Sequence, residues 1–181
     1  MAVEDRLIFL ISKVYQKLII NLQKAFSKSG VEVTPIQVML LFFLQKNNGL
    51  SLTQISQGLM LENPTVTGLV DRLEKSGYVK RSDHPNDRRV YLVYLTEKGN
   101  KVADKALPIV KKLNEQIKEG YSEREIESFK KVLFGAFKGT LMKMMKIITL
   151  HPLVIVVERI CASASEIRRT WDPSPCDGRG N

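Results

Sequence analysis

Four basic side chains gather around one short turn of the sequence, at Lys80, Arg81, Arg88 and Arg89. A cationic loop tip suits the narrow, negatively charged minor groove of DNA. Asp87 lies among these cations, where a carboxylate can hold a guanidinium in a bidentate orientation before the arginine binds. The alternative is an ordinary surface ion pair, which contributes only about 0–1 kcal/mol to stability.

A second set of candidate groups lies just before the turn, on a predicted helix over residues 64–76. Its apolar residues recur at spacings of three and four and must face a core: Val66, Leu69, Val70 and Leu73. Other faces carry Thr65, Thr67, Gly68, Asp71 and Arg72. Threonine offers a hydroxyl to base edges and a methyl to thymine, and arginine can reach guanine or phosphate. The alternative for this polar face is simple solvation.

Gly68 stands out in that helix. Glycine in a helix interior costs roughly 1 kcal/mol relative to alanine. Its presence suggests that something approaches the helix closely, and the wall of a DNA groove is one candidate.

The elements around these residues occur in a recognisable order. A short helix from Ser51 to about Gly58 is followed by the helix opening at Asn63-Pro64, and then by strands over 78–83 and 89–95. Turn-forming residues 84–87 join the two strands. This order predicts a winged helix-turn-helix, whose second helix enters the DNA major groove.

Helix-capping residues in the sequence predict where the helices begin. Residues 34–37, 51–54 and 122–125 each read as a capping box, in which a hydroxyl residue and a later Gln or Glu cap the helix reciprocally. Asn63 is expected to cap the helix that follows it, with Pro64 in its first turn. Gly77 is expected to end that helix in a left-handed conformation.

Two amphipathic helices lie outside the predicted winged domain, over residues 4–28 and 122–146. Their apolar stripes have no partner inside one small winged domain, so a homodimer is expected; the alternative is an intramolecular core. Between them, a helix over 35–46 is expected to bury Val38, Met39, Leu41, Phe42 and Leu44, and a further helix runs from Thr96 to about Glu119. The fold class is therefore mainly α with a small β-hairpin wing, a winged helix-turn-helix domain joined to a helical dimerisation domain.

Composition favours a polyanionic partner. The 181-residue chain has a net charge of +9, which suits nucleic acid or an anionic membrane surface. Residues 147–181 hold four basic and four acidic residues, so the whole excess lies in residues 1–146. Membrane binding ranks low because the apolar run 147–157 is too short to span a bilayer and lacks interleaved cations.

The residue patterns that an enzyme or a metal-binding protein would need are not found in the sequence. His84 and His151 have no plausible nucleophile near them, and no metal-ligand spacing or phosphate-binding glycine loop occurs, so neither an enzyme nor a cofactor or metal is predicted. Only Cys161 and Cys176 are present, so we expect a reducing, cytoplasmic location. A winged helix that binds only protein would not need the arginine-rich turn, and a salt-dependent DNA shift would separate it from a DNA-binding one.

One set of motifs resembles the MarR family (multiple-antibiotic-resistance regulators). The matching segments are Asp71-Arg72-Leu73-Glu74, Gly77-Tyr78-Val79, Arg81, Asp87-Arg88-Arg89 and Leu95-Thr96-Glu97-Lys98-Gly99. The resemblance implies a homodimeric regulator of transcription, a ligand-responsive repressor, that reads a pseudo-palindromic DNA operator. It also implies that Arg89 enters the minor groove and that Asp87 orients it.

Four segments follow from the motifs and the resemblance together. They are a dimerisation helix over 1–30, the DNA-binding domain over 31–96, dimerisation helices over 97–146, and a tail over 147–181 that is disordered from about residue 170. Members of the family usually end near the last helix, so the tail is a true extension, a cloning remnant or a read-through product. The first helix has no cysteine, which argues against hydroperoxide sensing.

Two sets of site residues are predicted. The DNA-contacting set is Ser51, Asn63, Thr65, Thr67, Arg72, Asp87, Arg88 and Arg89. For a small apolar or aromatic effector, which only the resemblance implies, the candidates are Tyr15, Met39 and Phe43, with simple core packing as the alternative. The operator, the regulated genes, the effector and the choice between repression and activation do not follow from the sequence.

Overall fold

The computed structural model describes residues 6–85 and 87–148. The chain divides into two compact units, one up to Gly120 and one from Tyr121 onward, which we describe separately. The expected disordered tail lies outside the described residues. None of the helices within those residues is long and apolar enough to cross a membrane.

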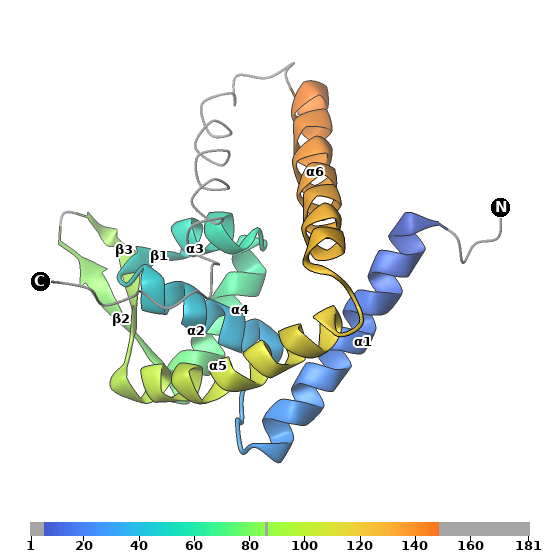
Figure 1. Ribbon diagram of the computed structural model, residues 1–181. Helices are drawn as coiled ribbons and strands as arrows, with labels where there is room; N and C mark the ends of the chain where they lie inside the picture. The colour runs from blue at the N-terminus through green and yellow to red at the C-terminus, as the bar shows by residue number, and fades with distance from the viewer. Residues whose placement is uncertain (1–5, 86, 149–181) are drawn as a thin grey trace, which may run out of the picture. The chain divides into compact units, whose positions relative to one another are not determined.

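The first unit contains five helices and three short strands among its described residues (Figure 1). They are α1 (Leu7–Lys28), α2 (Pro35–Lys46), β1 (Leu50–Ser51), α3 (Leu52–Leu59), α4 (Asn63–Lys75), β2 (Val79–His84), β3 (Asp87–Leu95) and α5 (Glu97–Lys118). The second unit contains α6 (Glu123–Ile148). The predicted winged helix-turn-helix is confirmed: α3 and α4 form the helical pair, and β2 and β3 form the wing.

Reciprocal caps begin α2 and α3, as the sequence predicts. The Thr34 hydroxyl accepts the Gln37 backbone N–H at 3.4 Å, and the Gln37 side chain accepts the Thr34 backbone N–H at 2.8 Å. Ser51 and Gln54 repeat the arrangement at 3.2 and 2.8 Å. These bonds satisfy N–H groups that a helix start otherwise leaves unpaired.

The prediction that Asn63 caps α4 is wrong. The helix already includes Asn63, and Glu62 takes the cap position without a side-chain hydrogen bond. Pro64 therefore occupies the second helical position. A backbone N–H at that position has no acceptor within the helix, so proline, which lacks the N–H, removes no helical hydrogen bond there. The end of the helix is as expected, since Gly77 has a φ of +73° and the next N–H, from Tyr78, bonds to the Leu73 carbonyl at 2.9 Å.

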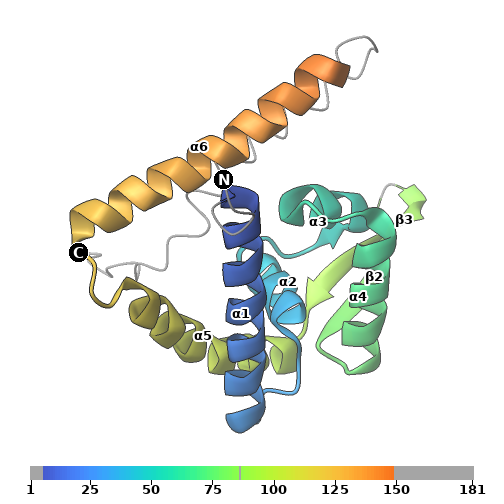
Figure 2. The ribbon, with the colours of Figure 1, turned by 90° about the vertical axis from the view of Figure 1, so that its right-hand side faces the viewer.

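The sheet has the antiparallel order β1-β3-β2. The wing register pairs Val79 with Leu95 and Arg81 with Val93. The first strand pairs Leu50 with Val93, and the sequence analysis missed it because two residues carry no detectable alternation. The β2–β3 hairpin projects to one side of the helices of its unit (Figures 1 and 2).

The hydrophobic core joins the helix-turn-helix to α1, α2 and α5. All four apolar residues predicted to face inward from α4 are buried: Val66, Leu69, Val70 and Leu73. In α2 the prediction was partly wrong, since Leu40 is fully buried whereas Met39 and Phe42 are only half-buried. Nearly every residue of α2 is apolar, so its spacing alone could not identify the buried side.

A third cap opens α6 in the second unit. The Ser122 hydroxyl and backbone N–H both donate to the Glu125 carboxylate, at 2.7 and 2.8 Å. These hydrogen bonds, the one from the hydroxyl foremost, hold the pKa of Glu125 below its usual value. The predicted capping box over 122–125 is thus confirmed.

The start of α5 is locked against the end of α4. The Thr96 hydroxyl donates to the carbonyl of Gly77 at 2.8 Å and accepts the Gly99 backbone N–H at 3.0 Å. Gly99 is buried, and a Cβ placed there would lie 2.0 Å from the Tyr78 carbonyl oxygen. Because that oxygen belongs to the backbone, only glycine allows α5 to start at this point.

We therefore expect Gly99→Ala to lower the free energy of unfolding by about 1–3 kcal/mol through overpacking. Urea denaturation measures the effect. Lys101→Ala is the control, since the Lys101 side chain is 74% exposed and its loss should change stability by less than about 0.5 kcal/mol. Equal stability of the two variants would show that the backbone shifts freely at this junction.

Candidate nucleic-acid interface

The exposed side of α4 carries the candidate base-reading residues. Asn63, Thr65 and Arg72 are exposed, whereas Thr67 and Gly68 are half-buried. Burial of the apolar side against the core fixes the rotation of the helix, so these polar groups lie on the sides of α4 that the core leaves free.

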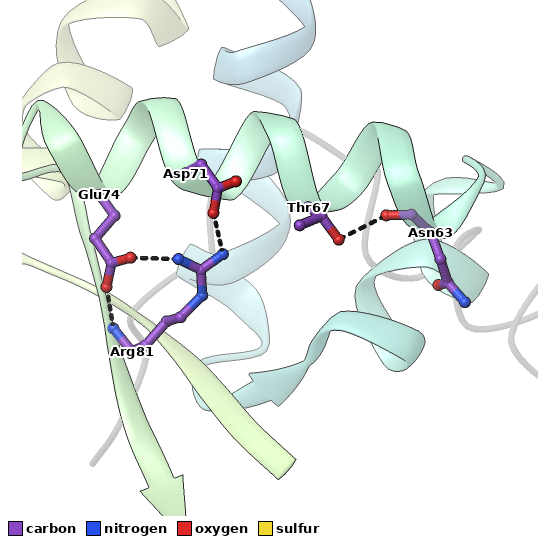
Figure 3. A network of polar contacts seen from close by, with 5 residues as sticks. All are labelled: Asn63, Thr67, Asp71, Glu74 and Arg81. Carbon is purple, nitrogen blue, oxygen red and sulfur yellow. Dashed lines mark hydrogen bonds and ion pairs between the residues drawn. The ribbon is translucent and has the colours of Figure 1, made fainter. Parts of the chain in front are cut away.

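Thr67 and Asn63 are linked within the helix. The Thr67 hydroxyl donates to the Asn63 carbonyl at 2.9 Å, one turn earlier (Figure 3). The hydroxyl proton is therefore engaged, and Thr67 retains only acceptor capacity and its methyl group for a partner. Thr65, which is more exposed, is the less constrained of the two threonines.

Ser51 has a structural role at the start of α3. Its hydroxyl accepts the Gln54 backbone N–H as part of the cap, and Ser51 also pairs with Leu92 in the sheet. The hydroxyl proton is not needed for the cap, so donation to a phosphate is chemically compatible with that role.

The wing carries Asp87, Arg88 and Arg89 at the start of β3. Asp87 and Arg89 are exposed. The side chain of Arg88 is not among those that the structure describes. The Asp87 carboxylate accepts the backbone N–H of Arg89 at 3.0 Å. This contact fixes the main chain beside the arginine, which differs from the direct hold on the guanidinium that the sequence analysis expected.

Arg81 is the wing cation whose role the sequence analysis missed. Its guanidinium donates to Asp71 at 2.6 Å and to Glu74 through a short second contact, and both carboxylates come from α4 (Figure 3). The backbone N–H of Arg81 also donates to Glu74 at 2.9 Å. We call this group of three residues the Arg81 clamp.

The clamp favours the charged form of the guanidinium. Burial disfavours that charge, but the hydrogen bond to Asp71 and the negative charge of Glu74 outweigh it, so the pKa of Arg81 is raised. Arg81 therefore joins the wing to α4 rather than offering a free cation. The sequence signal was present, because Asp71 and Glu74 lie three residues apart on one helix face.

The three effector candidates lie in different surroundings. Tyr15 is 63% exposed on α1, Met39 is half-buried, and Phe43 packs so tightly on α3 that a Cβ at Gly58 would lie 2.2 Å from its ring. A groove of about 620 Å³ lies between α1 and α5. Its lining is Asn21, Lys24, Ala25, Lys28, Ser29, Pro108, Ile109, Lys112, Leu113 and Gln116.

Metal-ligating clusters are absent from the part of the chain that the structure describes: no three His, Cys, Asp or Glu residues there could share an ion. Hydroxyl, amide and guanidinium groups on a helix, beside a basic hairpin, are groups that hydrogen-bond to nucleic acid.

Comparison with known proteins identifies the relatives of this arrangement. The MarR family profile matches residues 33–91, from just before α2 into β3. The HTH-type transcriptional repressor YetL of Bacillus subtilis is 29% identical over 113 residues, which is 62% of this chain and 68% of YetL. Over residues 33–91 the chain belongs to the MarR family. The predicted family is thereby confirmed, as is a regulator rather than an enzyme.

Solved MarR-type structures share the fold. A MarR family regulator from Rhodococcus sp. RHA1 is 25% identical with a TM-score of 0.65, covering 75% of this chain and 95% of its own. BpsR of Bordetella bronchiseptica, whose DNA binding is regulated by 6-hydroxynicotinic acid, has a TM-score of 0.70 at 22% identity, over 75% and 96% of the two chains. The latter likeness concerns the fold alone.

Breaking the clamp should loosen the wing. We expect Arg81→Met, which keeps an apolar stem of similar reach, to cost about 1–2 kcal/mol of unfolding free energy, because hydrogen bonds to partly exposed carboxylates are lost. Thermal denaturation and amide exchange in β2 measure the effect.

Lys80→Met is the matched control, since Lys80 is the exposed neighbour of Arg81 in the same strand. It should change stability by less than about 0.5 kcal/mol. If the two variants lose equal stability, the clamp contributes nothing beyond loss of a surface charge.

Proposed function

We propose that this protein is a sequence-specific double-stranded-DNA-binding repressor of transcription that acts in the cytoplasm as a homodimer on a pseudo-palindromic operator. The observation that carries the proposal is the outward polar face of α4 beside an exposed basic wing. Membership of a family that includes the repressor YetL supports it.

In this proposal α4 lies in the major groove. Thr65 and Arg72 are exposed on one side of the helix and read base edges there, with Asn63 at its start. Ser51 and Thr67 contact DNA with the hydrogen-bonding capacity that their structural bonds leave. The net charge of +9 attracts the duplex at long range.

The wing is proposed to enter the adjacent minor groove through Arg89, with Arg88 on the flanking phosphates. A groove that is narrow and negative favours an inserted arginine largely independently of base identity. Asp87 orients this contact, and its bond to the Arg89 backbone N–H supports an indirect form of that role.

Homodimerisation is supported by apolar surface that one chain leaves uncovered. Exposed apolar residues on α1 are Leu7, Ile8, Leu10, Ile11, Val14, Tyr15 and Ile20. On α6 they include Phe129, Val132 and Leu133. Apolar side chains spaced along both helices are typical of a surface that a second subunit covers.

An effector is the least specified part of the proposal. BpsR, which shares the fold, responds to 6-hydroxynicotinic acid, a small aromatic acid. We propose a small apolar or aromatic ligand for this chain as well. Of the candidate residues, Tyr15 has the most surface free to contact it, whereas Phe43 is engaged with α3.

Selection of DNA fragments by the purified protein, followed by sequencing and salt titration, tests the proposed function. Arg89→Ala should weaken binding to many duplexes and lower the slope of log affinity against log salt by about one unit. Thr67→Ala should instead change preference at one position by about 1 kcal/mol. Lys101→Ala, a charge loss on α5, is the control. A wild-type protein that shows no salt-sensitive binding would exclude the function.

The orienting role of Asp87 has a test of its own. Removing a negative charge improves binding to DNA by simple electrostatics, but losing the orientation of Arg89 weakens it. We expect Asp87→Ala to bind the selected duplex more weakly than wild type at fixed salt, as a milder form of Arg89→Ala. Tighter binding would mean that the wing acts only as a patch of positive charge.

The dimer is tested by light scattering, which should give twice the chain mass of 20.6 kDa. The double variant Ile8→Glu with Val14→Glu places charge on α1, where these side chains are 81% and 56% exposed. It should dissociate into folded monomers, because both sites lie outside the core. Lys13→Glu on the same helix is the control for charge alone. A wild-type monomer at micromolar concentration would refute the dimer.

A further inference from the structure

Gly68 occupies the middle of α4, on the face proposed to meet DNA. It lies in regular helix, and its φ is not among the positive values. A Cβ added at Gly68 would have no atom of the described residues within 4 Å, apart from its chain neighbours and the backbone of its own helix. Neither the backbone conformation at Gly68 nor the packing of the described residues therefore requires glycine at this position.

The other described glycines of the first unit each have an internal reason. Gly30, Gly49, Gly77 and Gly120 have φ values between +65° and +88°. At Gly58 a Cβ would lie 2.2 Å from the Phe43 ring, and at Gly99 it would lie 2.0 Å from the Tyr78 carbonyl. Gly68 is the exception among them.

Glycine at position 68 lowers the stability of α4, and no contact among the described residues of the first unit compensates for that loss. It is among the poorest helix formers, since it loses the most backbone freedom on ordering. Residues three before and four after it on the same face are Thr65 and Arg72, both exposed. The gap left by the missing side chain thus lies between two groups proposed to contact bases.

We propose that Gly68 is the point of closest approach between α4 and the DNA, and that its missing side chain sets how deeply the helix enters the major groove. The inference rests on the proposed function. Threonine has a short side chain, so its hydroxyl reaches a base edge only where the helix backbone lies close. A side chain at position 68 would hold the helix away and lengthen the contacts of Thr65 and Arg72.

The proposal predicts opposite effects of one substitution on folding and on binding. Gly68→Ala should raise the melting temperature by about 2–4 °C, because alanine favours the helix and nothing obstructs it. The same variant should bind the selected duplex at least tenfold more weakly. Gly68→Val should weaken specific binding further, while the affinity of both variants for random-sequence duplex should change by less than about threefold, since phosphate contacts dominate there.

Asn114→Ala on the exposed side of α5 is the control for helix stabilisation alone. It should raise the melting temperature and leave DNA affinity unchanged. If wild-type protein binds DNA and Gly68→Ala binds within twofold of it, this inference is overturned and the proposed function stands. A fall in melting temperature for Gly68→Ala would also overturn it, by showing an internal need for glycine. If wild-type protein binds no duplex, both fail.

Discussion

The junction between α4 and the wing is the constraint on which the proposed interface depends. Four apolar side chains anchor one side of α4 in the core, and the Arg81 clamp ties the other side to β2. Thr96 then joins the end of α4 to the start of α5 through the Gly77 carbonyl. A helix and a hairpin that are proposed to enter two neighbouring grooves need a fixed separation, and these contacts supply it within a single chain.

The clamp also arranges charge. Asp71 and Glu74 lie on the helix proposed to meet a polyanion, where free carboxylates would oppose binding. Arg81 offsets one of these two negative charges, and its own charge is thereby paired within the chain. Arg72 and Arg89 remain exposed for the duplex. The basic residues of the motif thus divide into one structural arginine and others proposed to bind DNA, a division that net charge alone does not reveal.

The sequence predicted those features that depend on local chemistry. Capping boxes at Thr34, Ser51 and Ser122, the left-handed Gly77 and the buried face of α4 are all as expected, because each is determined within about one or two helical turns. Features that depend on distant partners were missed. The two-residue strand β1 exists only because β3 lies beside it, and the role of Arg81 emerges only when β2 returns along α4. The prediction that Asn63 caps α4 was wrong by one residue, because sequence signals place a helix boundary only to within one or two residues.

The surroundings of three helical glycines explain two of them and leave the third unexplained. The sequence analysis singled out Gly68 inside a helix, and the structure places Gly58 and Gly99 in helices as well. Packing then separates them, because Phe43 accounts for Gly58 and the Tyr78 carbonyl for Gly99, whereas no side chain of the described residues lies near the missing Cβ of Gly68. An unexplained cost inside a folded chain directs attention to what the chain binds. The large apolar residues exposed along α1 and α6 follow the same logic, since the core of the described residues does not include them. A partner duplex and a second subunit would account for both, so the fold of one chain is only part of what this sequence specifies.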